Sequence, residues 1–88
     1  VSFTGGVSGA QNLIIDATAG NYTAGGNVAL TGTASLNATA SAAIDLNGST
    51  SAAGGVVLTA PAITAAAAIQ SSGGSIDVNG NITFDGIG

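Results

Sequence analysis

Aliphatic and polar residues alternate with a period of two in several short stretches of the chain. Four clear stretches are residues 28–31 (VALT), 44–47 (IDLN), 76–79 (IDVN) and 82–85 (ITFD). A period of two places the aliphatic side chains on one face of a strand and the Asp, Asn and Thr side chains on the other. The pattern therefore predicts short β-strands, each with one buried and one solvated face.

Apolar residues that would anchor such strands recur along the whole chain, and most are six to eight positions apart. The anchors are Ile14, Tyr22, Val28, Leu36, Ile44, Val57, Ile63, Ile69, Ile76 and Ile82. The one longer step, from Ile44 to Val57, has room for an additional polar strand around Thr50. Three ordinary steps make a coil of roughly 20 residues, so we predict an all-β fold, a parallel β-solenoid (β-helix) of about four coils.

Glycine pairs punctuate the same repeat. Gly-Gly occurs at residues 5–6, 25–26, 54–55 and 73–74, and the middle interval is clearly longer than the other two. Asn-Gly or Asp-Gly pairs at residues 47–48, 79–80 and 85–86 end three of the strands, where a turn favours residues that tolerate a positive φ. The long middle interval either holds one coil plus an extra half-coil around residues 44–50, or means that the Gly-Gly pairs occupy different corners. The sequence leaves both alternatives open.

Residues 62–70 (AITAAAAIQ) have a helical alternative, because alanine has the highest helix propensity. The stretch is short, follows Pro61 and precedes Ser-Ser-Gly-Gly, so a helix here would be marginal in isolation. Small side chains also suit the narrow interior of a coil. We therefore expect strands in this stretch too.

The charged residues restrict the function. The chain has no Lys, Arg or His, and Asp16, Asp45, Asp77 and Asp85 are its only acidic residues. Nothing can neutralise phosphates, so we expect no nucleic-acid partner, and no apolar run is long enough to predict membrane insertion. General acid–base and nucleophilic catalysis favour His, Glu, Lys or Cys, all of which are absent. We expect no catalytic residue and no enzymatic activity.

The only candidates for a metal site are two short pairs, Asp45 with Asn47 and Asp77 with Asn79. Each pair projects two oxygen-bearing side chains from one strand face beside a turn. Ca²⁺ takes about six to eight oxygen ligands, so neighbouring coils would have to complete the site. Asp and Asn also favour turns because they hydrogen-bond their own backbone, and this explanation is favoured. The pairs are weak Ca²⁺ candidates, and we expect no cofactor.

Several segments resemble known repeats. Residues 25–32 (GGNVALTG), 54–60 (GGVVLTA) and 73–86 (GGSIDVNGNITFDG) resemble the repeats of large secreted bacterial adhesins of the filamentous haemagglutinin type. Residues 1–17 (VSFTGGVSGAQNLIIDA) are similar to the linking repeats of the same proteins. The resemblance implies a right-handed parallel β-helix, export to the cell surface, and a role in adhesion or biofilm formation. It carries over no functional residue, because this part of such proteins is mostly a spacer.

We expect residues 1–88 to form a single solenoid segment, either part of a longer array or an assembling subunit. The expected function is a structural, extracellular module of a bacterial cell-surface adhesin or self-assembling filament, such as a biofilm or sheath scaffold. Open solenoid ends expose unpaired backbone groups, so the expected partners are identical subunits joined end to end or neighbouring repeats of the same polypeptide. The alternative is a module that binds surface glycans. Ice binding is less favoured, because only residues 31–33 have the form Thr-x-Thr.

Overall fold

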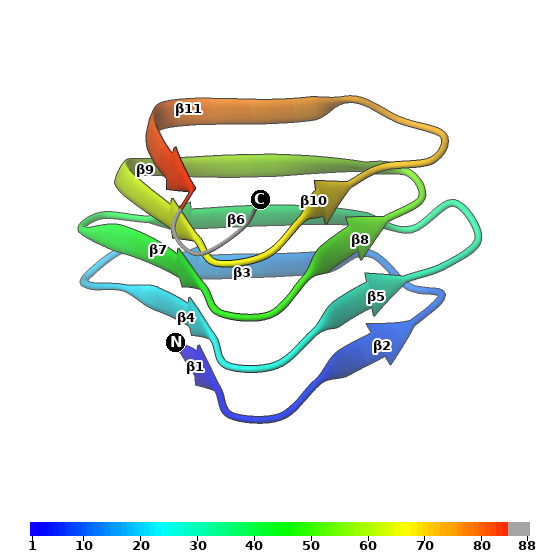
Figure 1. Ribbon diagram of the computed structural model, residues 1–88, viewed down its shortest axis with the longest axis horizontal. Helices are drawn as coiled ribbons and strands as arrows, with labels where there is room; N and C mark the ends of the chain where they lie inside the picture. Colours follow the sequence, from blue (N-terminus) through cyan, green and yellow to red (C-terminus); the bar gives the residue numbers. More distant parts are fainter. Residues whose placement is uncertain (85–88) are drawn as a thin grey trace.

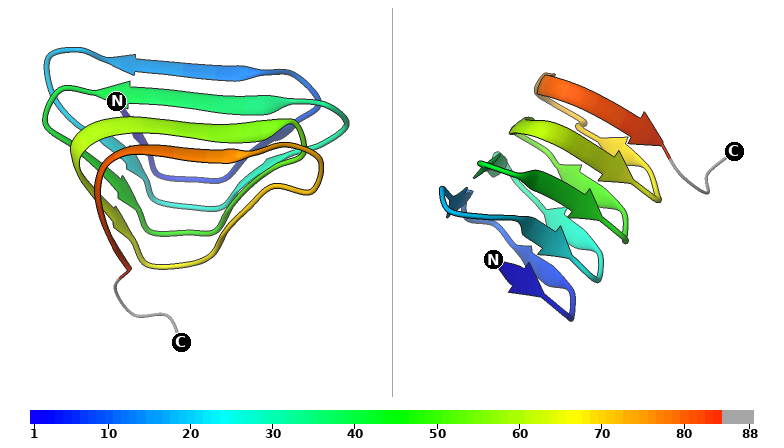
Figure 2. Two further views of the ribbon diagram at one scale, coloured as in Figure 1. Left: turned by 90° about the horizontal axis from the view of Figure 1, so that it is seen from above. Right: turned by 90° about the vertical axis from the view of Figure 1, so that its left-hand side faces the viewer.

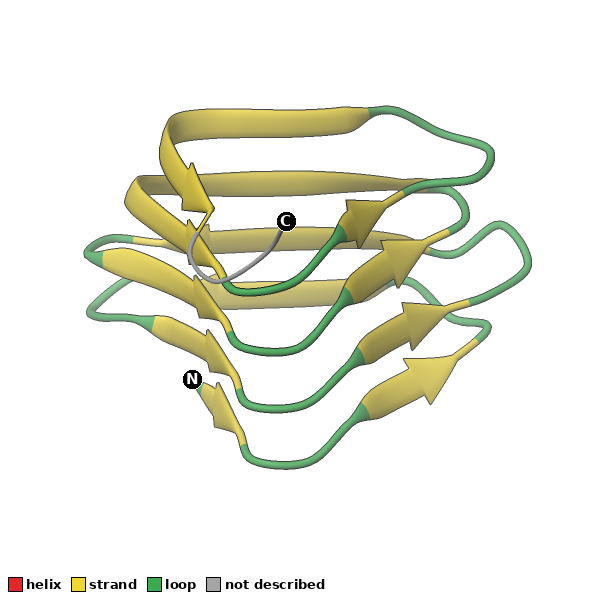
Figure 3. Ribbon diagram, in the orientation of Figure 1, coloured by secondary structure: helices red, strands yellow, loops and turns green. Residues whose placement is uncertain are grey.

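The computed structural model describes residues 1–84, which form a right-handed coil of parallel strands (Figure 1). The strands are β1 (Ser2–Phe3), β2 (Val7–Gly9), β3 (Leu13–Ala17), β4 (Tyr22–Ala24), β5 (Val28–Leu30), β6 (Ser35–Ala40), β7 (Ala43–Leu46), β8 (Thr50–Ala52), β9 (Gly55–Ala65), β10 (Ile69–Gln70) and β11 (Ile76–Phe84). Seen from the β11 end, the chain turns counterclockwise as it rises (Figure 2), the hand that connections between parallel strands almost always adopt. Strands and loops account for all described residues (Figure 3), so none of them belongs to a helix that could cross a membrane.

The coil has three sides, and each strand level on a side is called a rung. Side A contains β1, β4, β7 and the second halves of β9 (62–65) and β11 (81–84). Side B contains β2, β5, β8 and β10. Side C contains β3, β6 and the first halves of β9 (55–59) and β11 (76–79). Side C is the flat wall in Figure 2, and sides A and B meet opposite it.

The register of the strands confirms the predicted solenoid. Paired residues on neighbouring rungs, such as Ala43 with Ala62 or Leu13 with Leu36, are about one predicted coil apart in the sequence. β9 and β11 continue round the corner between sides C and A, which joins these sides into one seven-stranded sheet. Side B forms a separate four-stranded sheet. The chain thus makes about four coils of roughly 20 residues, as the sequence predicts.

Alternate residues of stacked strands form apolar columns inside the coil. On side A, one column contains Tyr22, Ile44 and Ile63, and the next contains Ala24, Leu46 and Ala65. On side C, Leu36 stacks with Val56, and Ala38 stacks with Leu58. All of these side chains are buried. Alanine shares the interior with the larger side chains in two of these columns, Ala24–Leu46–Ala65 and Ala38–Leu58, which lets the columns pack closely in a narrow interior.

Two of the apolar residues that were predicted to anchor strands in the interior point outward instead. Ile14 is 74% exposed, and Val57 lies on the outer face between two buried neighbours. Each is the middle residue of three consecutive aliphatic residues, where a period of two does not define which one faces inward. The polar residue two positions further on, Asp16 or Thr59, shares the outer face and so fixes the orientation.

The helical alternative for residues 62–70 is wrong, because they contribute to β9 and β10. Pro61 lies at the corner between sides C and A. There, Ala60 and Pro61 of β9 together face the single Gly80 of β11, which has a φ of 138°. The missing N–H of proline is tolerated at such a bulge.

The Gly-Gly pairs occupy two different corners, which decides between the two alternatives for the long interval. Residues 25–26 stack on residues 4–6 at the corner between sides A and B, and the chain returns to this corner at Gly48. Residues 54 and 73–74 stack at the corner between sides B and C. The long interval is therefore one coil plus one side. A Cβ at Gly48 would collide with the backbone of Gly26, so close approach of the coils, rather than a positive φ, requires glycine here.

Candidate interaction surfaces

Within residues 1–84, the apolar columns are covered in the middle of the coil and exposed at its two ends. Every partly buried apolar residue packed against the core lies in a terminal coil. The N-terminal end face consists of Val1, Phe3, Val7 and Leu13, and the C-terminal end face consists of Ile69, Ile76, Val78, Ile82 and Phe84. Among the described residues, these two end faces are the main surfaces on which apolar side chains of the core columns remain exposed.

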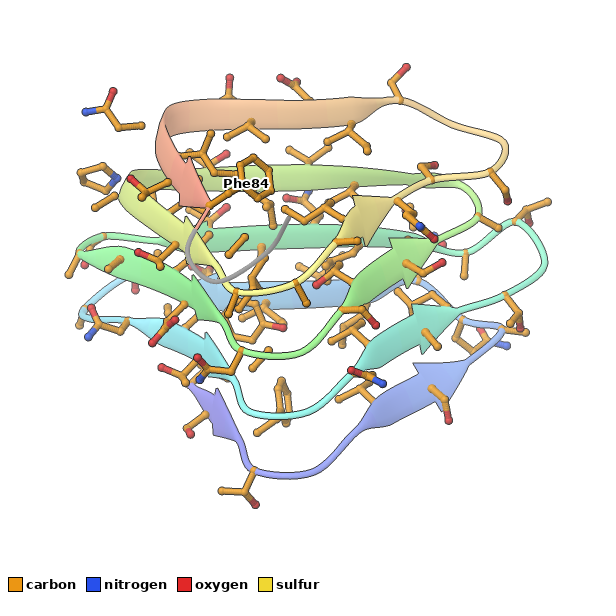
Figure 4. All side chains as sticks on the ribbon, in the orientation of Figure 1. Phe84 is labelled. Carbon is orange, nitrogen blue, oxygen red and sulfur yellow. The ribbon has the colours of Figure 1, made fainter. Side chains whose placement is uncertain are left out.

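The C-terminal end face repeats the core pattern, and no described residue forms a rung above it. Ile76 pairs in register with Val56, and Phe84 pairs with Ala65. Val56 and Ala65 are fully buried, whereas Ile76 is 47% exposed and Phe84 is 53% exposed. Figure 4 shows the Phe84 ring at the end of β11, directed across the open coil. Among residues 1–84, β11 pairs only with β9, so its other edge presents backbone groups that no described strand pairs.

The outermost strand at the N-terminal end face is very short. β1 has two residues, and its Phe3 ring meets the Tyr22 ring edge-on with 6.1 Å between centroids. The Val1 ammonium group donates a hydrogen bond to the Asn21 carbonyl oxygen at 2.7 Å, and the Gly25 N–H donates to the Phe3 carbonyl oxygen at 2.7 Å. Even so, Val1 remains 53% exposed.

The outer faces carry columns of small and polar side chains. The outer column of side A is Ser2, Thr23, Asp45, Thr64 and Thr83. The two outer columns of side C are Ile14, Asn37, Val57, Asp77 and Asp16, Thr39, Thr59, Asn79. Within side C, the Asn79 amide donates to the Thr59 hydroxyl at 3.4 Å. Side C is thus a flat wall with one entirely polar column beside a column in which aliphatic and polar residues alternate.

The weak Ca²⁺ candidates are not brought together. Asp45 and Asn47 lie at the end of side A, whereas Asp77 and Asn79 lie on side C of the last coil. The rung neighbours of Asp45 are two threonines, and the rung neighbour of Asp77 is Val57, which has no oxygen to offer from its side chain. Within residues 1–84, no group of three acidic, His or Cys side chains is positioned to hold a metal ion. Asp85 lies outside the described residues.

Two corner asparagines connect successive coils, a role that the sequence interpretation missed. The Asn12 side-chain oxygen accepts a hydrogen bond from the Ser35 N–H at 2.9 Å, and the Asn27 side-chain oxygen accepts one from the Ser49 N–H at 3.0 Å. The signal is present in the sequence: each Asn precedes an inward residue, and a Ser occupies the equivalent position about one coil later. These bonds fix the height of one coil on the next.

Among residues 1–84, two polar side-chain atoms are buried inside the coil without a hydrogen-bond partner, the Tyr22 hydroxyl and the Thr50 Oγ1. Thr50 stands in an inward column between Val28 and Ile69. Burial raises the pKa of the Tyr22 hydroxyl above its ordinary value. Residues 1–84 line no pocket.

The comparisons with known proteins identify no relative. No protein-family model matches the sequence. Neither the curated proteins nor the solved structures gave a match. The similarity to adhesin repeats therefore stays a hypothesis, and the function has to be argued from the geometry of the coil.

Proposed function

We propose that the chain is a structural extracellular module that acts by extending a rod along the solenoid axis, in a bacterial surface adhesin or a self-assembling filament. One observation carries the proposal: among the described residues, the apolar columns are covered everywhere except at the two end faces. Rods of this kind scaffold an adhesive surface, a biofilm or a sheath by their shape.

The end faces favour stacking along the axis, because stacking would bury apolar side chains and pair free backbone groups at the same time. A further rung would bury the exposed halves of Ile76 and Phe84, which contributes about 1 kcal/mol each. The same rung would pair the free strand edge, in the manner of strand addition to an open sheet. The covering rung belongs either to an identical subunit or to a neighbouring repeat of the same polypeptide.

The charge of the chain works against association through its sides. The formal net charge is −4, and no basic side chain is present to pair with the aspartates. Asp16, Asp45 and Asp77 all stand on outer columns. Like charges on the sides repel neighbouring rods, whereas the two end faces defined above consist of apolar side chains. Growth along the axis is therefore favoured over lateral clumping.

Sedimentation velocity and electron microscopy of the purified chain test the proposal. We expect concentration-dependent growth into rods or fibres, and we expect the substitution Phe84→Asp to abolish it by placing a carboxylate in the end face. Thr83→Asp is the matched control, because it adds the same charge one residue away on the outer column. A wild-type chain that stays monomeric up to millimolar concentration, or equal effects of the two substitutions, would refute stacking through the end face.

Glycan binding is a second candidate, favoured by the flat side C with its columns of Asn, Thr and Asp side chains. Such columns present hydroxyl and amide groups at a regular rung spacing to a flat polysaccharide. A glycan array provides the test, with Asn37→Ala and Asn79→Ala as variants of the face. Binding tighter than millimolar that both variants weaken would support this function, and unchanged binding would exclude side C.

A further inference from the structure

The number of rungs differs between the sides of the coil. Among the described residues, side A has five rungs, whereas sides B and C have four each. Sides A, B and C follow one another along the coil, so the lowest level left unfilled by the described residues is on side B. A second copy set with its β1 directly on β11 would therefore leave one level empty on sides B and C.

The first and last rungs of side A are equivalent in sequence. Val1, Ser2 and Phe3 correspond to Ile82, Thr83 and Phe84. Phe3 and Phe84 stand in one inward column whose other members are Ala24, Leu46 and Ala65. Phenylalanine thus occurs in this column only at its two ends, and the described chain spans four turns from one Phe to the other.

We propose that the second half of β11 replaces β1 of a second copy, which gives a continuous head-to-tail stack of parallel rungs. This inference rests on the proposed function, since it specifies how the end faces meet. In the stack, β2 of the second copy lies on β10, its β3 lies on the first half of β11, and its β4 lies on the second half of β11. No level is then empty on any side.

The inward columns continue across this junction. Val7 of the second copy meets Ile69, Leu13 meets Ile76, and Ile15 meets Val78, so apolar residues stack on apolar residues. Phe84 takes the place of Phe3 against Tyr22, where the present ring contact is edge-on at 6.1 Å.

The outer columns also match across the junction. Asp16 of the second copy faces Asn79, whose amide can donate to a carboxylate. Asp77 faces Ile14, and Thr83 faces Thr23. No two carboxylates of the described residues meet at the junction, so the stack avoids like-charge contacts.

β1 is a strand that can be displaced. It has two residues, and its flanking Val1 is 53% exposed. β11 has nine residues, of which eight pair with β9 in register. The exchange replaces a short terminal strand by one that is anchored on both sides C and A. The new rung also buries Phe84 on its upper face.

Paired cysteines distinguish the exchanged stack from an unexchanged one, because the chain has no cysteine of its own. In the exchanged stack, residue 83 of one copy pairs with residue 23 of the next at a rung spacing of about 4.8 Å, within reach of a disulfide. Within one chain, these residues are three rungs apart, about 14 Å, which is too far for a disulfide. The variant T23C/T83C therefore reports only the exchanged junction. S2C/T83C reports a stack in which β1 stays in place, and T64C/T83C is the control for linkage within one chain.

Under mild oxidation of the full chain, we expect T23C/T83C to form a ladder of multiples of 8.1 kDa on non-reducing gels. We expect S2C/T83C to stay at background and T64C/T83C to give a linked monomer. Adding Phe84→Ala should lower the yield of the T23C/T83C ladder about fivefold, since about half of a phenylalanine side chain is no longer buried at the junction. Deleting residues 1–3 should raise the extent of assembly, because it removes the competing strand.

The outcomes separate this inference from the proposed function. Assembly of the wild-type chain with linkage in S2C/T83C but not in T23C/T83C overturns the strand exchange and leaves end-to-end stacking intact. Reduced assembly after deletion of residues 1–3 also overturns the exchange. A wild-type chain that does not assemble at any concentration overturns both.

Discussion

Replacing the buried hydroxyl of Thr50 by a methyl group should stabilise the fold. Thr50 is 1% exposed, its Oγ1 has no hydrogen-bond partner, and it stands in an inward column between Val28 and Ile69. An unsatisfied buried hydroxyl costs about 1–3 kcal/mol, and valine has nearly the same shape without that group. We therefore expect Thr50→Val to raise the free energy of unfolding by about 1–3 kcal/mol.

Urea and thermal unfolding followed by circular dichroism measure this gain. For a domain of this size, each 1 kcal/mol corresponds to a rise in Tm of about 4–8 °C. Thr64→Val is the matched control, because Thr64 lies on the outer column of side A and its change should stay within about 0.5 kcal/mol. A Thr50→Val protein that is no more stable than the wild type would show that the hydroxyl does have a partner, and would refute the assignment of Thr50 as an unsatisfied group.

Three further predictions concern the interior of the coil. Tyr22→Phe should remove the loss of stability at alkaline pH. Burial raises the pKa of the Tyr22 hydroxyl in the folded state, so the unfolded chain ionises first, at its pKa of about 10. The free energy of unfolding of the wild type therefore falls as the pH rises above that value. Unfolding curves at pH 9 to 12 check this, and a slope that persists in Tyr22→Phe would contradict it. Gly48→Ala should lose about 1–3 kcal/mol or more because its Cβ collides with the coil below, whereas Gly20→Ala, with open space around the position, should change stability little. Leu36→Ala should cost about 2–5 kcal/mol and Leu13→Ala clearly less, because the two share a column but only Leu36 is fully buried. Urea unfolding measures these losses of stability. Equal losses for Gly48→Ala and Gly20→Ala, or for Leu36→Ala and Leu13→Ala, would contradict the packing described for the coil.

The alternation of aliphatic and polar residues was enough to predict the parallel coil and its repeat, because a period of two defines which residues share a face. It could not orient Ile14 or Val57, since three consecutive aliphatic residues satisfy either orientation. The glycine pairs marked corners without saying which corner each belonged to. That information lies in the contacts between coils, where residues about one coil apart in the sequence approach each other.

The sequence predicted that the open ends of the solenoid would be interaction surfaces, but it did not predict which residues form them. Ile76 and Val56 have similar sequence surroundings and stand in the same column, yet Ile76 is 47% exposed and Val56 is fully buried. The difference comes from their level in the stack, which no local pattern encodes. Thr50 shows the opposite case, since a polar strand was expected around it and the column between Val28 and Ile69 buries it completely. Asn12 and Asn27 were overlooked because their hydrogen bonds join residues 23 and 22 positions apart.

The stacked register of the rungs has a mechanical consequence. β1 and β11 lie at opposite ends of the axis (Figure 1), so a tensile load applied through them opens the backbone hydrogen bonds of one rung after another instead of shearing many together. Each coil that peels away releases about 70 Å of contour length, from roughly 20 residues at about 3.4 Å each. A molecule with this geometry should therefore lengthen under load in separate steps of about one coil each.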